Sequence, residues 1–214
     1  MRTQKRIRPA LEVIIEFSAI FFYIWFLDKA AAPQWFKGVF FWGFCVGFPI
    51  FCIGSEQRYY PEFSLDWGAF LKCLRLILWF TLAGTGLLVF ISLYFKSFNY
   101  DEQFLTRVSE YFFWAFLQQI GLQTFLTRRV EKAVRNPYLS AFLSSTLFAL
   151  LHMPNPALVI FSWVGGFFWA LSFQATPNLY ALAVSHGWLA VVAWHCVPPA
   201  WLHGLRIGPT YWKF

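Results

Sequence analysis

The sequence predicts an all-α protein, a polytopic bundle of about seven or eight transmembrane helices that forms a single integral membrane domain over residues 1–214. The first observation is composition, because 59% of the 214 residues are hydrophobic and only 13% are charged. A soluble domain is about 45–50% apolar and about 25% charged, and its interior is too small to hide so many apolar side chains. The second observation is that long apolar runs recur along the whole chain, which is typical of bilayer-spanning helices.

Charged residues and prolines interrupt these runs and define the expected helices. They fall near residues 10–27, 38–54, 68–95, 104–127, 138–152, 157–174 and 179–197. The run at 138–152 is shorter than the roughly 20 residues of a full crossing, so it is expected to lie partly inside the bundle or to continue past Pro137. An eighth, irregular segment within 198–214 stays open, and Tyr211, Trp212 and Lys213 are expected to anchor this end at the interface.

The distribution of basic residues predicts a multi-pass protein with a cytoplasmic N-terminus. With seven crossings, eleven basic residues lie on the N-terminal side and six on the other, and basic residues favour the cytoplasmic side. The eleven are Arg2, Lys5, Arg6, Arg8, Arg58, Lys72, Arg75, Arg128, Arg129, Lys132 and Arg135, and the six are Lys29, Lys37, Lys96, Arg107, Arg206 and Lys213. Their place at the ends of apolar runs indicates contacts with membrane lipid rather than with nucleic acid.

The N-terminal segment has two interpretations. "MRTQKRIRPA" has the basic character of a signal-peptide n-region, and "DKAAAPQ" at 28–34 offers a cleavage site, so residues 1–32 could be a cleaved signal. Glu12 and Glu16 favour a retained first helix instead, because the apolar region of a signal peptide rarely holds carboxylates.

Three groups of polar residues interrupt the later apolar runs. The first is Gln118, Gln119 and Gln123, the second is His152, and the third is His186. Polar groups in lipid-embedded helices face the bundle interior and find partners there. Gln119 and Gln123 are four residues apart and share one helical face. From spacing alone, hydrogen bonds between helices and satisfied core histidines would explain all three groups, so a purely structural role stays open.

The arrangement of these residues resembles the CAAX protease and bacteriocin-processing family of intramembrane endopeptidases. That family carries E-E-x-x-x-R, F-x-x-x-H and H-x-x-x-N motifs on successive helices. Here "QQIGLQ" at 118–123 occupies the first motif and "FALLH" at 148–152 matches the second in full. "NLYALAVSHGWLA" at 178–190 matches the third at Asn178, Leu179 and His186, while Ala190 stands where an asparagine is common. The resemblance covers the motif core, roughly residues 104–197.

The resemblance implies a catalytic set of Gln118, Gln119, Gln123, His152 and His186, supported in a polar intramembrane cavity by Phe148, Asn178 and Trp188. In the family the paired glutamates activate the attacking water, whereas histidines and a polar residue orient the water or stabilise the oxyanion. An amide oxygen is a very weak base, so glutamines keep the shape of glutamates without their proton chemistry. Gln123 in place of arginine is consistent with this, because a buried cation without the carboxylates would be costly.

Other groups could replace the missing glutamate base. Glu110 lies about 12 Å from Gln118 by helical rise and is expected near the interface, and Glu131 is expected to pair with a cation in a basic loop. His152 or His186 could accept the proton, since histidine titrates near neutrality. A zinc ion held by His152, His186 and His203 would be a third route, whereas His195 is expected to be an interfacial residue.

Three functions therefore remain open on the sequence. The first is a CAAX-type endopeptidase-like membrane protein whose hydrolysis is lost or weak, and which binds a membrane-embedded or prenylated peptide. The second is an active peptidase that uses His152 and His186, with or without a metal. The third is a non-enzymatic membrane binding or transport protein with incidental motifs.

Overall fold

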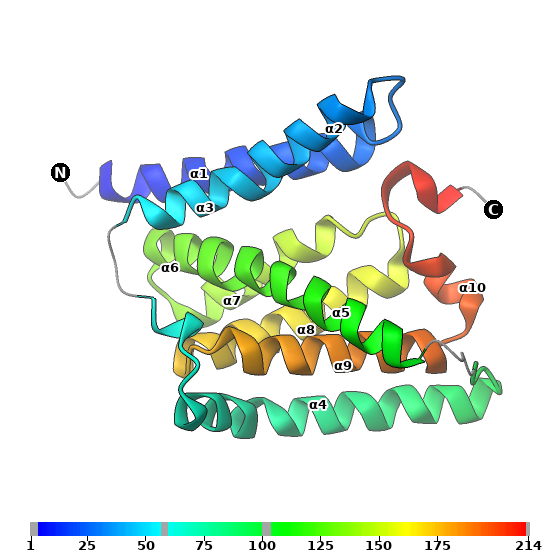
Figure 1. Cartoon of the computed structure of the whole chain (residues 1–214). Coiled ribbons are helices and arrows are strands. Elements are labelled where there is room, and N and C mark those ends of the chain that lie inside the picture. The colour runs from blue at the N-terminus through cyan, green and yellow to red at the C-terminus, as the bar shows by residue number, and fades with distance from the viewer. Residues whose placement is uncertain (1–3, 57–59, 100–103, 213–214) are drawn as a thin grey trace.

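The computed structural model describes residues 4–56, 60–99 and 104–212, and every regular element in these ranges is helical (Figure 1). The first half contains α1 Gln4–Phe22, which runs on into the π-helical η1 Tyr23–Leu27, then α2 Gln34–Phe40, η2 Phe41–Gly47, α3 Phe48–Gly54, η3 Pro61–Phe63 and α4 Trp67–Phe95. The second half contains α5 Phe104–Gln119, η4 Ile120–Thr127, α6 Arg128–Val134, α7 Pro137–Leu150, α8 Pro156–Ala175, α9 Leu179–Cys196, α10 Pro199–Leu202, η5 His203–Leu205 and η6 Gly208–Trp212. The all-α prediction is confirmed.

Five of the described helical segments are long and apolar enough to cross a membrane. They are Arg8–Leu27, Gln34–Gly54, Trp67–Phe95, Pro156–Ala175 and Leu179–Cys196. On α4 the side chains of Trp79, Leu93 and Tyr94 are more than 70% exposed, which suits contact with lipid rather than water. The chain is an integral membrane protein. Of the basic residues that predict its orientation, Arg2, Arg58 and Lys213 lie outside the described residues.

All seven expected helices are present, and each begins and ends within a few residues of its expected bounds except at two places. The first helix, expected from residue 10, already begins at Gln4. The helix expected to end at 127 continues through η4 and α6 to Val134. The expected eighth segment is only the four-residue helix α10 followed by short turns. Helix α7 has 14 residues and is the short apolar helix that the sequence predicts.

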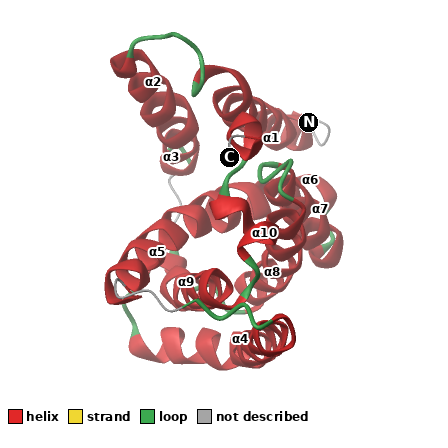
Figure 2. Cartoon of the chain, turned by 90° about the vertical axis from the view of Figure 1, so that its right-hand side faces the viewer, coloured by secondary structure: helices red, strands yellow, loops and turns green. Residues whose placement is uncertain are grey.

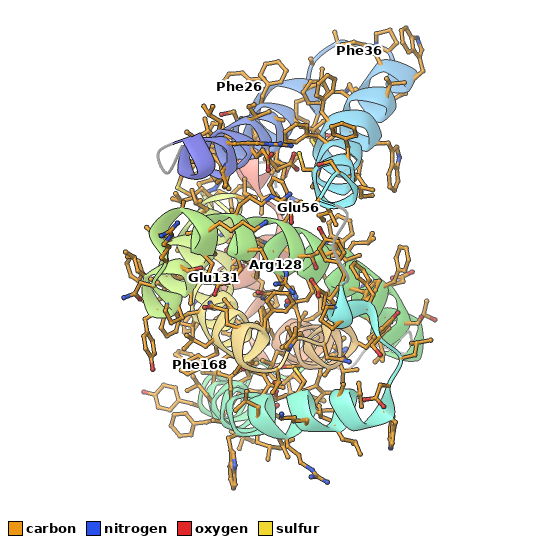
Figure 3. All side chains as sticks on the ribbon, turned by 90° about the vertical axis from the view of Figure 1, so that its left-hand side faces the viewer. Phe26, Phe36, Glu56, Arg128, Glu131 and Phe168 are labelled. Atoms are coloured by element: carbon orange, nitrogen blue, oxygen red, sulfur yellow. The ribbon has the colours of Figure 1, made fainter. Side chains whose placement is uncertain are left out.

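The continuation into α6 places Arg129 inside the protein, where its side chain is completely buried. Its Nε donates to Glu12 Oε2 of α1 at 2.9 Å, and its NH1 lies 3.1 Å from Glu56 Oε1, just after α3. Lys132, one turn further along α6, also donates to Glu56 Oε1, at 2.5 Å. These ion pairs join the hairpin α1–α3 (residues 4–54) to α6, and the two segments lie side by side in Figures 1 and 3.

A second ion pair holds the segment that leads into α4. The guanidinium of Arg128 binds the fully buried Glu62 through two nitrogens, Nε at 2.9 Å and NH2 at 2.8 Å. The expectation that Glu131 pairs within a basic loop is wrong. Glu131 lies in α6 and has no ion-pair partner among the described residues, because Glu12, Glu56 and Glu62 take up the neighbouring cations instead.

The remaining helices surround a shared apolar core, which Figure 2 shows end on. Helices α5 and α9, α4 and α9, and α7 and α8 pack together most extensively. The core side chains between them come from five helical segments, and they include Ile77, Leu122, Phe148, Trp169 and Leu182. Side chains of Asp66, Asn136, Asn155 and Asn178 cap the N-termini of α4, α7, α8 and α9, which satisfies backbone N–H groups that no helical partner reaches.

The ion pairs of Glu56 predict an acid-sensitive contact between the hairpin and α6. Burial raises the pKa of Glu56, but the hydrogen bond from Lys132 and the charges of Arg129 and Lys132 outweigh it, so the pKa lies below its ordinary value of 4.5. A carboxyl with a lowered pKa stabilises the folded state above its unfolded pKa and loses that effect as pH falls through the folded one. We expect Glu56→Gln to reduce the loss of thermal stability that the native protein shows below about pH 4.5.

Glu131→Gln is the matched control, since it removes the same charge from a carboxyl without an ion pair. Its acid-stability curve in detergent should follow that of the native protein. If the two variants have the same curve, Glu56 does not carry the acid sensitivity of this contact.

Candidate active site

A chain of side-chain hydrogen bonds runs from the end of η4 to a histidine of α9. Gln123 Nε2 donates to Gln119 Oε1 at 3.0 Å, and Gln119 Nε2 lies 3.3 Å from His186 Nδ1. The one hydroxyl proton of Thr127 has two acceptors within reach, the Leu122 carbonyl oxygen at 2.8 Å and Gln123 Oε1 at 3.1 Å. Thr127, Gln123 and Gln119 are completely buried. Gln119 ends α5 and Gln123 lies in the π-helical segment η4, a local distortion that often accompanies functional sites. Two of the three glutamines are thus joined to one of the two predicted histidines.

The hydrogen-bond partners define which ring nitrogen of each histidine carries a proton. The amide N–H of Gln119 donates to Nδ1 of His186, so the proton of a neutral His186 is on Nε2. His152 lies in the turn after α7, and its Nδ1 is 2.9 Å from the carbonyl oxygen of Phe148. A carbonyl only accepts, so His152 carries its proton on Nδ1 and its Nε2 is a free acceptor.

The two histidines come together around one phenylalanine. The ring centroid of Phe148 is 4.9 Å from that of His152 and 6.4 Å from that of His186. Neither Nε2 atom has a hydrogen-bond partner among the described residues, and neither belongs to the fully enclosed unpartnered atoms, so each keeps some exposed surface. One site therefore offers a bound group both a hydrogen-bond acceptor, His152 Nε2, and a donor, His186 Nε2–H.

One residue that the sequence does not predict completes the surroundings of His186. Trp169 of α8 stacks on the imidazole with ring centroids 4.2 Å apart. Its indole N–H donates to Ser185 Oγ at 3.1 Å, and Ser185 shares a 2.7 Å hydrogen bond with Thr81 of α4. The tryptophan holds the plane of the histidine ring. With 12 Trp and 28 Phe in the chain, no local signal singles this residue out.

Helices α5 and α9 approach closely at the site because of a glycine. A Cβ atom on Gly187 would lie 3.1 Å from Cα of Phe112 and 3.3 Å from its backbone nitrogen. Such contacts are tighter than side chains normally make with backbone. The missing side chain at the residue after His186 therefore lets the α5 backbone, and with it Gln119, come within reach of the imidazole.

The other predicted site residues lie apart from this group. Gln118 is half-buried and makes no side-chain hydrogen bond within the described residues. Asn178 Oδ1 caps α9 through the N–H of Ala181, eight residues and about 12 Å by rise before His186. Trp188 is 45% exposed and donates to Thr85 Oγ1 of α4. Phe148 alone of the predicted supporting residues contacts the histidines.

The described part of the chain holds no group of three or more His, Cys, Asp or Glu side chains that could bind a metal ion. His203 stacks on Tyr211 in the C-terminal segment, with ring centroids 4.3 Å apart, and does not join His152 and His186. The backbone of Asn99 lies against His195, whose Nδ1 is 2.6 Å from the Asn99 carbonyl oxygen. Glu110 is exposed on α5.

Comparison with protein-family models matches residues 101–192 to the family described as "Type II CAAX prenyl endopeptidase Rce1-like". Over these residues the chain is similar to the CAAX prenyl endopeptidases. The matched core contains the amide chain, Phe148, both site histidines and Trp169, whereas the hairpin α1–α3 and α4 precede it. Searches of curated proteins and of solved structures found no significant match.

The amide chain predicts that two glutamine substitutions lower the free energy of unfolding by different amounts. Gln123→Leu leaves the fully buried Gln119 Oε1 without a donor, which costs about 1–3 kcal/mol. Gln118→Leu is the matched control, because Gln118 gives up no hydrogen bond, and it should change stability by less than about 0.5 kcal/mol. Thermal unfolding of both variants in detergent measures the difference. Equal losses would contradict a hydrogen-bonded chain through Gln123.

The same geometry predicts the tautomers of the two histidines in this core. In the protein labelled with 15N-histidine, NMR should find His152 protonated on Nδ1 and His186 protonated on Nε2. Gln119→Leu should change the nitrogen shifts of His186 and leave those of His152 in place. A proton on Nδ1 of His186 would mean that both amides are turned and that the chain of donors runs in the opposite direction.

Proposed function

We propose that this protein is a CAAX-type endopeptidase-like membrane protein whose peptide hydrolysis is lost or weak, and which binds a membrane-embedded or prenylated peptide without efficient cleavage. The observation that carries the proposal is the neutral amide chain from Gln123 through Gln119 to His186. A general base contributes about 10²–10⁴-fold to such a reaction, and an amide oxygen at this position supplies none of it. We further propose that residues 1–214 form one membrane domain with a cytoplasmic N-terminus.

The arrangement of the amide chain supports binding of a peptide rather than proton transfer. The nitrogen and the oxygen of the Gln119 amide and of the Gln123 amide all form hydrogen bonds within the protein, so their role is to fix the ring of His186. The exposed Nε2 atoms of the two histidines and the unpaired amide of Gln118 are left to meet a peptide group, which offers one N–H and one carbonyl oxygen.

A second function, an active peptidase, is favoured by one specific observation. His152 Nε2 is a free acceptor and His186 Nε2–H is a free donor, and both rings pack on Phe148. In such a reaction His152 would take a proton from water as the water oxygen bonds to the peptide carbon. His186 would donate a hydrogen bond to the carbonyl oxygen, and the proton on His152 would pass to the leaving amine. A carboxylate would hold the protonated histidine better than the carbonyl of Phe148 does, so this route is expected to be slow.

A paired proteolysis assay separates the two functions. The native protein and the triple variant Gln118→Glu, Gln119→Glu, Gln123→Arg are reconstituted in liposomes with a panel of membrane peptides, with and without chelator. We expect the variant to cleave at least 10²-fold faster than the native protein, because it regains a base and a cation to neutralise the carboxylates.

His152→Ala in the triple-variant background is the control for the site, and it should abolish the gained activity. Native cleavage that matches the variant, and that His152→Ala removes, would overturn the proposal in favour of the histidine route. Inhibition by chelator would then show that a metal takes part. A folded triple variant that binds peptides but cleaves none would show that glutamine is not what limits hydrolysis.

A further inference from the structure

A groove between α1 and α3 lies outside the glutamine–histidine site and outside the family-matched residues. It encloses about 480 Å³, within the range of about 300–1,000 Å³ that is usual for ligand sites. Its lining residues are Leu11, Ile15, Phe48, Phe51 and Cys52, together with Arg8 and Glu12. The walls are therefore apolar, and the only charged side chains in the lining are one arginine and one glutamate.

The charged end of the groove carries an unbalanced positive charge. Arg8 Nε donates to Glu12 Oε1, and the other oxygen of Glu12 accepts from Arg129. Glu56 is shared between Arg129 and Lys132. Three cations thus face two carboxylates, which leaves one net positive charge.

Arg8 is the most exposed of these three cations. Its side chain is 74% exposed, and its terminal NH1 and NH2 groups have no acceptor among the described residues. The terminal nitrogens of Arg129 also lack a hydrogen-bond partner among the described residues, but they are enclosed within the protein, and Lys132 donates to Glu56. A planar guanidinium with free N–H groups binds phosphate oxygens well.

The groove is charged at one end and apolar along the rest of its length, as a lipid molecule is. The first candidate membrane span begins at Arg8 and the second ends at Gly54, so the arginine lies at the boundary of the apolar zone. Leu11 and Ile15 follow it into that zone on α1, opposite Phe51 and Phe48 on α3. A phosphate group at the boundary would contact the arginine, and an acyl chain below it would contact the apolar walls.

We propose that this groove binds an anionic phospholipid, with the headgroup on the guanidinium of Arg8 and one acyl chain over Leu11, Ile15, Phe48 and Phe51. Because Glu12 joins Arg8 to Arg129, the bound lipid also stabilises the contact between the hairpin and α6. The site is independent of the proposed peptide function.

The test measures the thermal stability and the lipid retention of the full-length protein in a zwitterionic detergent. Phosphatidylglycerol is titrated against phosphatidylcholine of the same acyl chains and against inorganic phosphate, and retained lipid is counted by native mass spectrometry. We expect only phosphatidylglycerol to raise the melting temperature. Arg8→Gln should weaken this effect about fivefold, and Arg8→Lys, which keeps the charge, should retain most of it.

Two further variants keep the proposal falsifiable. Arg75→Gln removes a cation that is also exposed, from α4, which lies on the far side of the bundle from α1 (Figure 1), and it should leave the phosphatidylglycerol effect unchanged. Ile15→Trp narrows the groove without changing charge, and it should reduce lipid retention.

Three results would overturn the proposal. An equal effect of phosphatidylcholine would mean that charge is not recognised. An equal effect of inorganic phosphate would mean that the acyl chain adds nothing. An equal loss in Arg75→Gln would mean that the lipid responds to the total basic charge and not to this groove.

Discussion

The buried guanidinium of Arg129 is the constraint on which the hairpin depends. A charged group cannot be enclosed in an apolar bundle without partners. The partners come from two separate segments, Glu12 of α1 and Glu56 after α3, and the ring of Phe125 lies 5.0 Å below the guanidinium carbon. The arginine can be buried only where α1 and α3 both reach α6. The charge therefore fixes where the hairpin sits, although the ion pairs themselves add little net stability.

The continuous helix from α5 through η4 to α6 provides partners for its buried polar side chains in two ways. At its end, Arg128, Arg129 and Lys132 are matched by carboxylates from distant segments. In its middle, Gln119 and Gln123 are matched by neutral donors and acceptors, and the chain ends at a histidine ring. Each amide offers both a donor and an acceptor, so a run of amides can be satisfied within the protein and needs no counter-ion.

The sequence predicts those parts of this arrangement that depend on near neighbours. The helix positions follow from apolar runs, and the Gln119–Gln123 pair follows from a spacing of four residues. The predicted end of the 104–127 helix was wrong because the true end depends on residues far away in the sequence. Arg128 and Arg129 look like the start of a loop until Glu62 and Glu12, 66 and 117 residues away, neutralise them. The stacking of Trp169 on His186 also joins distant parts of the sequence, and no pattern near residue 169 predicts it.

The amide chain also explains why the two buried glutamines, Gln119 and Gln123, depend on each other. Arginine at 123 with glutamines at 118 and 119 would place an unbalanced cation where Gln123 is completely buried. Glutamate at 119 with glutamine at 123 would place an unbalanced carboxylate there instead, which would have to take up a proton. Either intermediate leaves one charge in an apolar interior with no opposite charge beside it, whereas the full charged set pairs the arginine with carboxylates and the full neutral set carries no charge. Gln119 and Gln123 share a hydrogen bond, so the effects of substitutions at these two positions are expected to be non-additive.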